Sequence, residues 1–88
     1  MEYQGSNDQT WVVNWWLNND GKSYQIMMDM ARTASNKLSL ADEIESFVLD
    51  NTPEIGGMFD DLLGLALLSV NWIEIADDFL NRLEEQEQ

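Results

Sequence analysis

The sequence predicts an all-α fold, a compact single domain of about five short helices. Three segments repeat their apolar residues at helical spacing, clusters of Asn, Gly and Pro separate segments, and no convincing pair of strands exists. The chain has 88 residues, of which 44% are hydrophobic and four are tryptophans, so it has the composition of a folding protein. We expect residues 1–83 to form the domain and the acidic residues 84–88 to fray at its end.

The first element, residues 10–17, has two interpretations. Its sequence, TWVVNWWL, is rich in residues that favour strands, and a strand here would make the protein α+β. A helix is preferred because no second segment offers a partner strand. In a helix Trp11 would contact Trp15 at i,i+4, and Val12 would contact Trp16 in the same way.

The next two helices are predicted from their apolar periodicity. Residues 23–34 place five apolar or aromatic side chains on one face: Tyr24, Met27, Met28, Ala31 and Ala34. Residues 40–50 follow Ser39, which is a suitable N-cap. Their buried face is expected to contain Leu40, Ile44, Phe47 and Val48.

Residues 51–57 combine a proline with two glycines and are expected to form a loop. Residues 58–70 then read as a helix that is apolar almost all round, apart from Asp60 and Asp61 near its start. This pattern predicts a central helix that the others cover. Gly64 is expected to mark a close approach of another helix, because glycine weakens a helix interior by about 1 kcal/mol.

The C-terminal helix has the clearest pattern of the chain. Asn71 is its expected N-cap, and Glu74 stands three residues later, where a capping-box carboxylate belongs. Its apolar residues recur at the spacing of one helical face: Trp72, Ile75, Ala76, Phe79, Leu80 and Leu83.

Charge limits the partners of this protein. Lys and Arg total 4 against 17 Asp and Glu, for a net charge of −13. Residues 38–88 hold thirteen of the acids and a single base, Arg82. Because a nucleic-acid-binding surface needs a basic stripe, direct binding of nucleic acid is not expected.

The chain has no cysteine and no histidine. Thiolate metal sites, zinc sites and Ser-His or Cys-His catalysis are therefore excluded, and only carboxylate chemistry remains. The adjacent pairs Asp60-Asp61 and Asp77-Asp78 point about 100° apart on a helix, so neither forms a catalytic dyad by itself. We expect no enzyme activity, no metal and no cofactor, with a hydrolase using Asp60 or Asp61 as the weakest alternative.

Targeting signals are not apparent either. The first residues carry no signal peptide, and the longest apolar run, residues 62–70, is too short to span a bilayer. We therefore expect a soluble cytoplasmic protein that does not contact a membrane.

Acidic helix faces are the candidate binding surface. Carboxylates at i,i+3 or i,i+4 lie about 5–6 Å apart, a spacing of the same order as that of successive phosphates. An exposed tryptophan beside them would be a suitable hot spot. Because three tryptophans within six residues cannot all point inward, either Trp11 or Trp16 is expected near the surface. The predicted partner-binding residues are Asp42, Glu43, Glu45, Asp50, Glu74, Asp77, Asp78, Trp11 and Trp16. The alternative is that these acids form a solvated face that only keeps the domain in solution.

Four motifs together resemble a family of small acidic proteins encoded by phages and plasmids. They are SNxxTWxV at residues 6–13, WLxND at 16–20, DLLxxAL at 61–67 and VNWxEIA at 70–76. The resemblance implies a mobile-element origin and a bacterial host cytoplasm, and it implies no catalytic residues. Small acidic proteins of this setting are similar in type to anti-CRISPR and anti-restriction proteins.

The leading functional hypothesis is an anti-defence inhibitor that mimics nucleic acid. Its acidic surface would occupy the basic groove of a host nucleic-acid-binding protein, such as a CRISPR effector or a restriction enzyme, without catalysis. The alternative is a small phage accessory or scaffold protein that forms a homodimer through its Trp-rich N-terminal helix.

Overall fold

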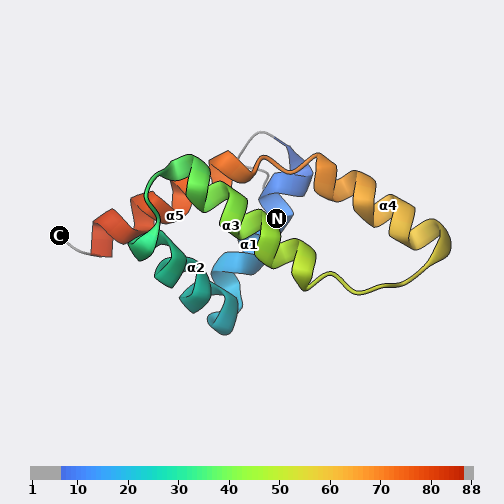
Figure 1. The fold of residues 1–88 in the computed structure, drawn as a ribbon, viewed down its shortest axis with the longest axis horizontal. Helices are drawn as coiled ribbons and strands as arrows, with labels where there is room; N and C mark the ends of the chain where they lie inside the picture. The colour runs from blue at the N-terminus through green and yellow to red at the C-terminus, as the bar shows by residue number, and fades with distance from the viewer. Residues whose placement is uncertain (1–6, 87–88) are drawn as a thin grey trace.

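The computed structural model describes residues 7–86 and confirms the all-α prediction. Its helices are α1 (Asp8–Asn19), α2 (Gly21–Thr33), α3 (Lys37–Asp50), α4 (Gly57–Leu68) and α5 (Trp72–Gln86), as Figure 1 shows. The described part of the chain contains no strand, so the alternative of a strand at residues 10–17 is wrong. These residues lie inside α1, since no neighbouring segment could satisfy a strand's backbone hydrogen bonds.

Asx side chains begin four of the five helices. In each case the side-chain oxygen of the N-cap accepts a hydrogen bond from the backbone N–H three residues later. These caps are Asn7, Asp20, Asn36 and Asn71. The predicted cap at Asn71 is confirmed. The third helix starts at Lys37, three residues before the predicted start, because Asn36 rather than Ser39 is its cap.

Four helices, α1, α2, α3 and α5, enclose the core. The closely packed pairs are α3 with α5, α1 with α2, α2 with α5, α1 with α5 and α2 with α3. The apolar faces predicted for α2, α3 and α5 all turn inward. The buried hydrophobic residues are Leu17, Met27, Met28, Ala31, Leu40, Ala41, Ile44, Val70, Ile75, Ala76 and Phe79.

The position of α4 contradicts the prediction of a covered central helix. None of its residues is buried, and it extends away from the other four helices, on the right of Figure 1. The described chain measures 47 × 27 × 23 Å, with a radius of gyration of 13.3 Å. A compact domain of this length would have a radius of gyration of about 12 Å.

The prediction about Gly64 is also wrong, because a Cβ added there would meet nothing within 4 Å. Both errors have one physical cause. A helix that is apolar all round is stabilised when its surface is covered, but the pattern does not specify which element covers that surface. Here α1, α2, α3 and α5, together with Val70, complete the core without α4. The connection, with Gly56 at φ 83° and Gly57 at φ 61°, leads α4 away from that core.

No helix within residues 7–86 combines the length and the apolar character that crossing a membrane would require.

Candidate protein-binding surfaces

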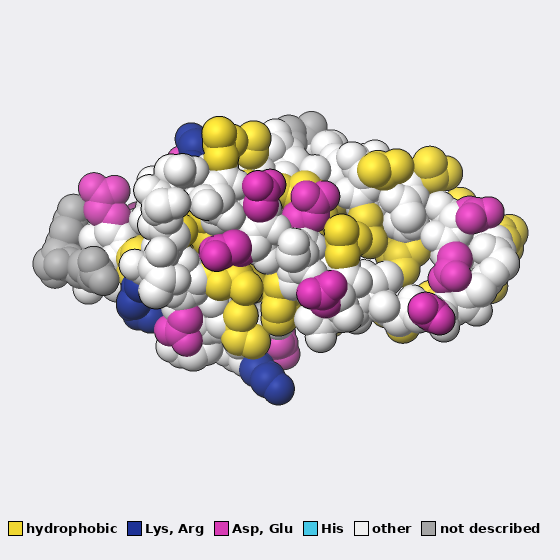
Figure 2. Space-filling view, viewed as in Figure 1, with side chains coloured by type: hydrophobic (Ala, Val, Ile, Leu, Met, Phe, Trp, Pro, Cys, Tyr) yellow, Lys and Arg dark blue, Asp and Glu magenta, His cyan; other side chains and the backbone are white. Residues whose placement is uncertain are grey.

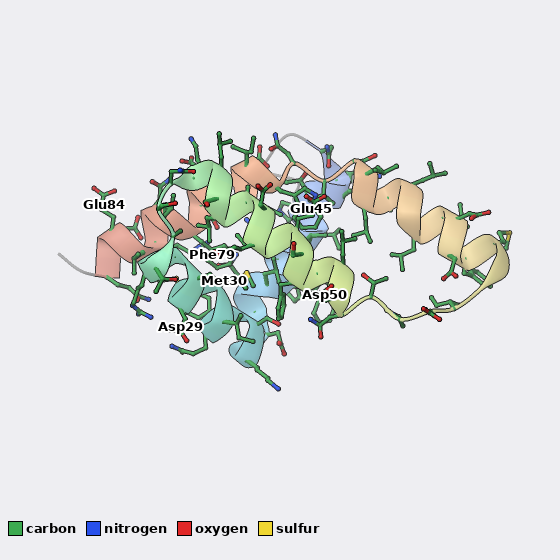
Figure 3. All side chains as sticks on the ribbon, in the orientation of Figure 1. Asp29, Met30, Glu45, Asp50, Phe79 and Glu84 are labelled. Atoms are coloured by element: carbon green, nitrogen blue, oxygen red, sulfur yellow. The ribbon has the colours of Figure 1, made fainter. Side chains whose placement is uncertain are left out.

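The outward face of α3 carries four predicted binding residues, Asp42, Glu43, Glu45 and Asp50. Asp42 points away from the buried Leu40 and Ile44. Glu45 lies on the side of this outward half that borders α5, and Glu43 and Asp50 lie on the side that borders α2. Figure 3 labels Glu45 and Asp50 on this helix, and Figure 2 shows acidic side chains gathered over it. In the described chain, no Lys or Arg nitrogen comes within 4.0 Å of these four carboxylates. We call these four residues the α3 acidic face.

Two grooves adjoin the α3 acidic face. One, of about 610 Å³, runs between the starts of α3 and α5 and includes Asp42 and Glu45. It also has apolar lining residues: Leu38, Ala41, Val70, Trp72 and Ile73. The other, of about 420 Å³, lies between α2 and α3 and is lined by Met30, Thr33, Asp42, Glu43, Ser46, Phe47 and Asp50. Both grooves therefore combine carboxylates with apolar contact surface, a combination that suits a protein partner.

The structure does not bring all seven predicted acids together. Asp77 on α5 pairs with Lys37, with 3.4 Å between Nζ and Oδ1. Asp78 pairs with Arg82 at 3.0 Å and accepts a hydrogen bond of 3.3 Å from Asn14 on α1. These interactions partly neutralise both α5 aspartates and direct Asp78 toward α1. Glu74 lies in the first turn of α5 and is half-buried.

The tryptophans of α1 differ in exposure. Trp16 is 60% exposed, which confirms that one of the two predicted tryptophans lies at the surface, while Trp11 is half-buried. Trp15 contacts Trp16 edge to face, with 5.3 Å between the ring centroids. Trp11 lies beside Asp78 and Arg82 in a small polar groove between α1 and α5. Trp11 therefore lies at a different groove from those beside the α3 acidic face.

Asp60 and Asp61, the weakest catalytic candidates, are exposed on α4. Asp60 Oδ1 accepts a 2.9 Å hydrogen bond from the backbone N–H of Ile55, so this carboxylate closes the turn that precedes α4. Over residues 7–86, no three acidic side chains converge in a way that could hold a metal ion.

Sequence reasoning missed one surface, the apolar exterior of α4. Its exposed hydrophobic residues are Met58, Phe59, Leu62, Leu65 and Leu68, with Ile55 just before them. On its other side, α4 forms an apolar groove of about 330 Å³ with α1, where Val12 faces Leu63 and Leu67. The signal is present in the sequence, since an apolar helix needs a cover, but the pattern does not indicate whether that cover comes from the same chain.

No family model, no curated protein and no solved structure matches this chain. The resemblance to phage and plasmid proteins therefore stays a prediction, and functional inference depends on the surfaces described above.

Proposed function

We propose that this protein is a non-catalytic anti-defence inhibitor that mimics nucleic acid. Its α3 acidic face would occupy the basic groove of a bacterial nucleic-acid-binding effector, a CRISPR effector or a restriction enzyme. The observation that supports the proposal is the arrangement of Asp42, Glu43, Glu45 and Asp50 on one outward helix face, without a base within 4.0 Å in residues 7–86.

The energetic argument begins with the unpaired state of these carboxylates. Four like charges on one face repel one another in the free protein, and the net charge of −13 adds to that repulsion. A partner groove lined with Lys and Arg would relieve the repulsion and accelerate association. Asp77 and Asp78 already have basic partners, so the proposal centres on α3 and assigns the α5 acids a smaller part.

Specificity would come from apolar contacts beside the charges. Leu38 and Ile73 are exposed at the groove that also contains Asp42 and Glu45. Apolar anchors surrounded by polar residues are the usual form of a binding hot spot, whereas charge alone gives speed and little selectivity.

The test uses charge reversal with a matched control. The test variant carries Asp42→Lys, Glu45→Lys and Asp50→Lys. The control carries Glu54→Lys, Asp61→Lys and Glu85→Lys, three exposed acids outside the α3 acidic face that change the net charge by the same amount. Both are compared with the native protein for displacement of a labelled DNA duplex from purified CRISPR effectors and restriction enzymes.

We expect the native protein and the control to displace the duplex from one effector, and the α3 variant to lose displacement by at least tenfold. High salt should weaken the native complex, because the contacts are ionic. Equal loss in both variants would indicate a dependence on net charge rather than on α3, and unchanged displacement by the α3 variant would refute the proposal.

A second candidate function is a self-associating phage accessory or scaffold protein. The observation that favours it is the exposure of Trp16, next to Trp15 and the exposed Val12 on α1. This function predicts that Trp16→Ala abolishes self-association and that charge reversal on α3 has no effect.

A further inference from the structure

The outer face of α4 is the largest exposed apolar feature that the proposed function does not use. Five of the twelve residues of α4 are hydrophobic side chains with more than half of their surface exposed. Leu68 reaches 83%. The half-buried residues of the same helix, Leu63, Ala66 and Leu67, face the groove with α1. The exposed and half-buried sides of α4 are therefore distinct, and the exposed side has no cover within residues 7–86.

The spacing on the exposed side is that of a helix-pairing seam. Met58, Leu62 and Leu65 follow one another at intervals of four and three residues. Apolar residues at alternating intervals of three and four place a line of side chains along one side of a helix, where a second helix can interdigitate. We propose that this face, the α4 seam, binds the α4 seam of a second copy of the chain.

The available area is sufficient for a specific dimer. Six apolar side chains on or beside the seam are each more than half exposed: Ile55, Met58, Phe59, Leu62, Leu65 and Leu68. Phe59 and Leu68 lie about 180° apart around the helix, on opposite edges of the seam, so one contact buries only part of each. At roughly 100 Å² for each side chain and half of that for these two, the seam supplies about 500 Å² per copy and about 1,000 Å² for a pair, the area that a specific interface should clear. A single apolar patch of this size lies at the upper end of what monomers expose.

An antiparallel arrangement keeps the like charges beside the seam apart. Asp61 flanks the seam on one side, and Leu68 flanks the same side two turns later. When Leu62 packs against Leu65 of the second copy, the reversed direction brings Asp61 closest to Leu68 of the second copy. The two Asp61 carboxylates are then separated along the axis. The α3 acidic face takes no part in this contact, so the inference does not depend on the proposed function.

The experiment measures the dimer dissociation constant of the full chain by sedimentation equilibrium. The test variant is Leu65→Glu, and the matched control is Leu38→Glu on α3, because the two leucines are 63% and 61% exposed. Leu65→Lys is added because it changes net charge in the opposite direction. Far-ultraviolet circular dichroism verifies that each variant keeps the helical content of the native chain.

We expect a native dimer, at least tenfold weakening in both Leu65 variants, and a control that dimerises like the native chain. Raising the salt concentration should strengthen the native dimer, because both copies carry a net charge of −13 and the contact itself is apolar. A native chain that stays monomeric at about 100 μM, a Leu65→Glu dimer of native affinity, or equal weakening by Leu38→Glu would each overturn the proposal. Dissociation by Trp16→Glu with no effect of the Leu65 variants would assign self-association to α1 instead.

Discussion

The Thr10 hydroxyl on α1 accepts a 2.8 Å hydrogen bond from the backbone N–H of Asn71, the residue that caps α5. Thr10 is a buried polar residue, only 1% exposed, and the two residues are 61 positions apart. Nearby, the Asn7 side-chain amide donates a 2.8 Å hydrogen bond to the carbonyl of Ser69. The turn between α4 and α5 is thus attached to the start of α1, and this attachment holds the C-terminal end of α4 beside α1.

Replacing Thr10 with Val should destabilise the protein by about 1–3 kcal/mol, because a partly buried hydrogen bond would be lost and the Asn71 N–H would lose its acceptor. Thr10→Ser keeps the hydroxyl and loses one methyl group, so it should cost less. Urea denaturation of the two variants measures the difference. A smaller loss for Val than for Ser would mean that the hydrogen bond contributes nothing.

Core and α4 residues should differ sharply in their sensitivity to truncation. Phe79 is fully buried, so Phe79→Ala should lower the free energy of unfolding by about 3–5 kcal/mol. Leu68→Ala on α4 should change it by less than about 0.5 kcal/mol in dilute solution, where the chain is monomeric. Denaturant titrations at low protein concentration provide both values. A comparable cost at the two positions would indicate that α4 packs into the core.

Salt should stabilise the monomer. The acidic side chains, which give the chain a net charge of −13, repel one another. The α3 acidic face has no base within 4.0 Å in the described chain. Screening that contributes about 1 kcal/mol would raise the melting temperature by roughly 4–8 °C for a domain of this size. Thermal melts at low and high sodium chloride concentration measure the effect. Replacing Asp42, Glu43 and Glu45 with Asn or Gln should reduce the rise in melting temperature with salt. A fall in the native melting temperature with salt would contradict the prediction.

Acid should weaken the cap of α2. The Ser23 hydroxyl donates a 2.6 Å hydrogen bond to Asp20, and the Ser23 N–H donates one of 3.0 Å. Both hydrogen bonds hold the pKa of Asp20 below its ordinary value of 3.8, and the bond from the hydroxyl has the larger effect. Because the pKa is lower in the folded state, the stabilisation exists above the unfolded pKa and is lost as pH falls through the folded pKa.

The matched variant for this effect is Asp20→Asn, since Asn caps a helix without titrating. The native free energy of unfolding, minus that of the variant, should decrease between about pH 5 and pH 2. The other acids are common to both proteins and cancel in the difference. Parallel stability curves over that interval would show that Asp20 keeps the same pKa on folding.

Local patterns predicted four helices well. In α5, Asn71 identified the start, and Ile75, Ala76 and Phe79 identified the buried face. These predictions succeed because capping and a one-sided apolar face depend on residues within a few positions of each other. The start of α3 was missed by three residues, because Asn36 and Ser39 are both suitable caps by residue type.

The all-α class, the apolar faces of α2, α3 and α5, and the net charge all follow from the order of residues alone. It also indicated that the helix after residue 57 requires a cover. Packing between distant segments settled that α4 has no cover within residues 7–86 and that Asp77 and Asp78 have basic partners. The physical reason is that periodicity reports which side of a helix is apolar. Which side of a uniformly apolar helix meets the core depends on contacts distant in sequence, such as the bond between Thr10 and Asn71.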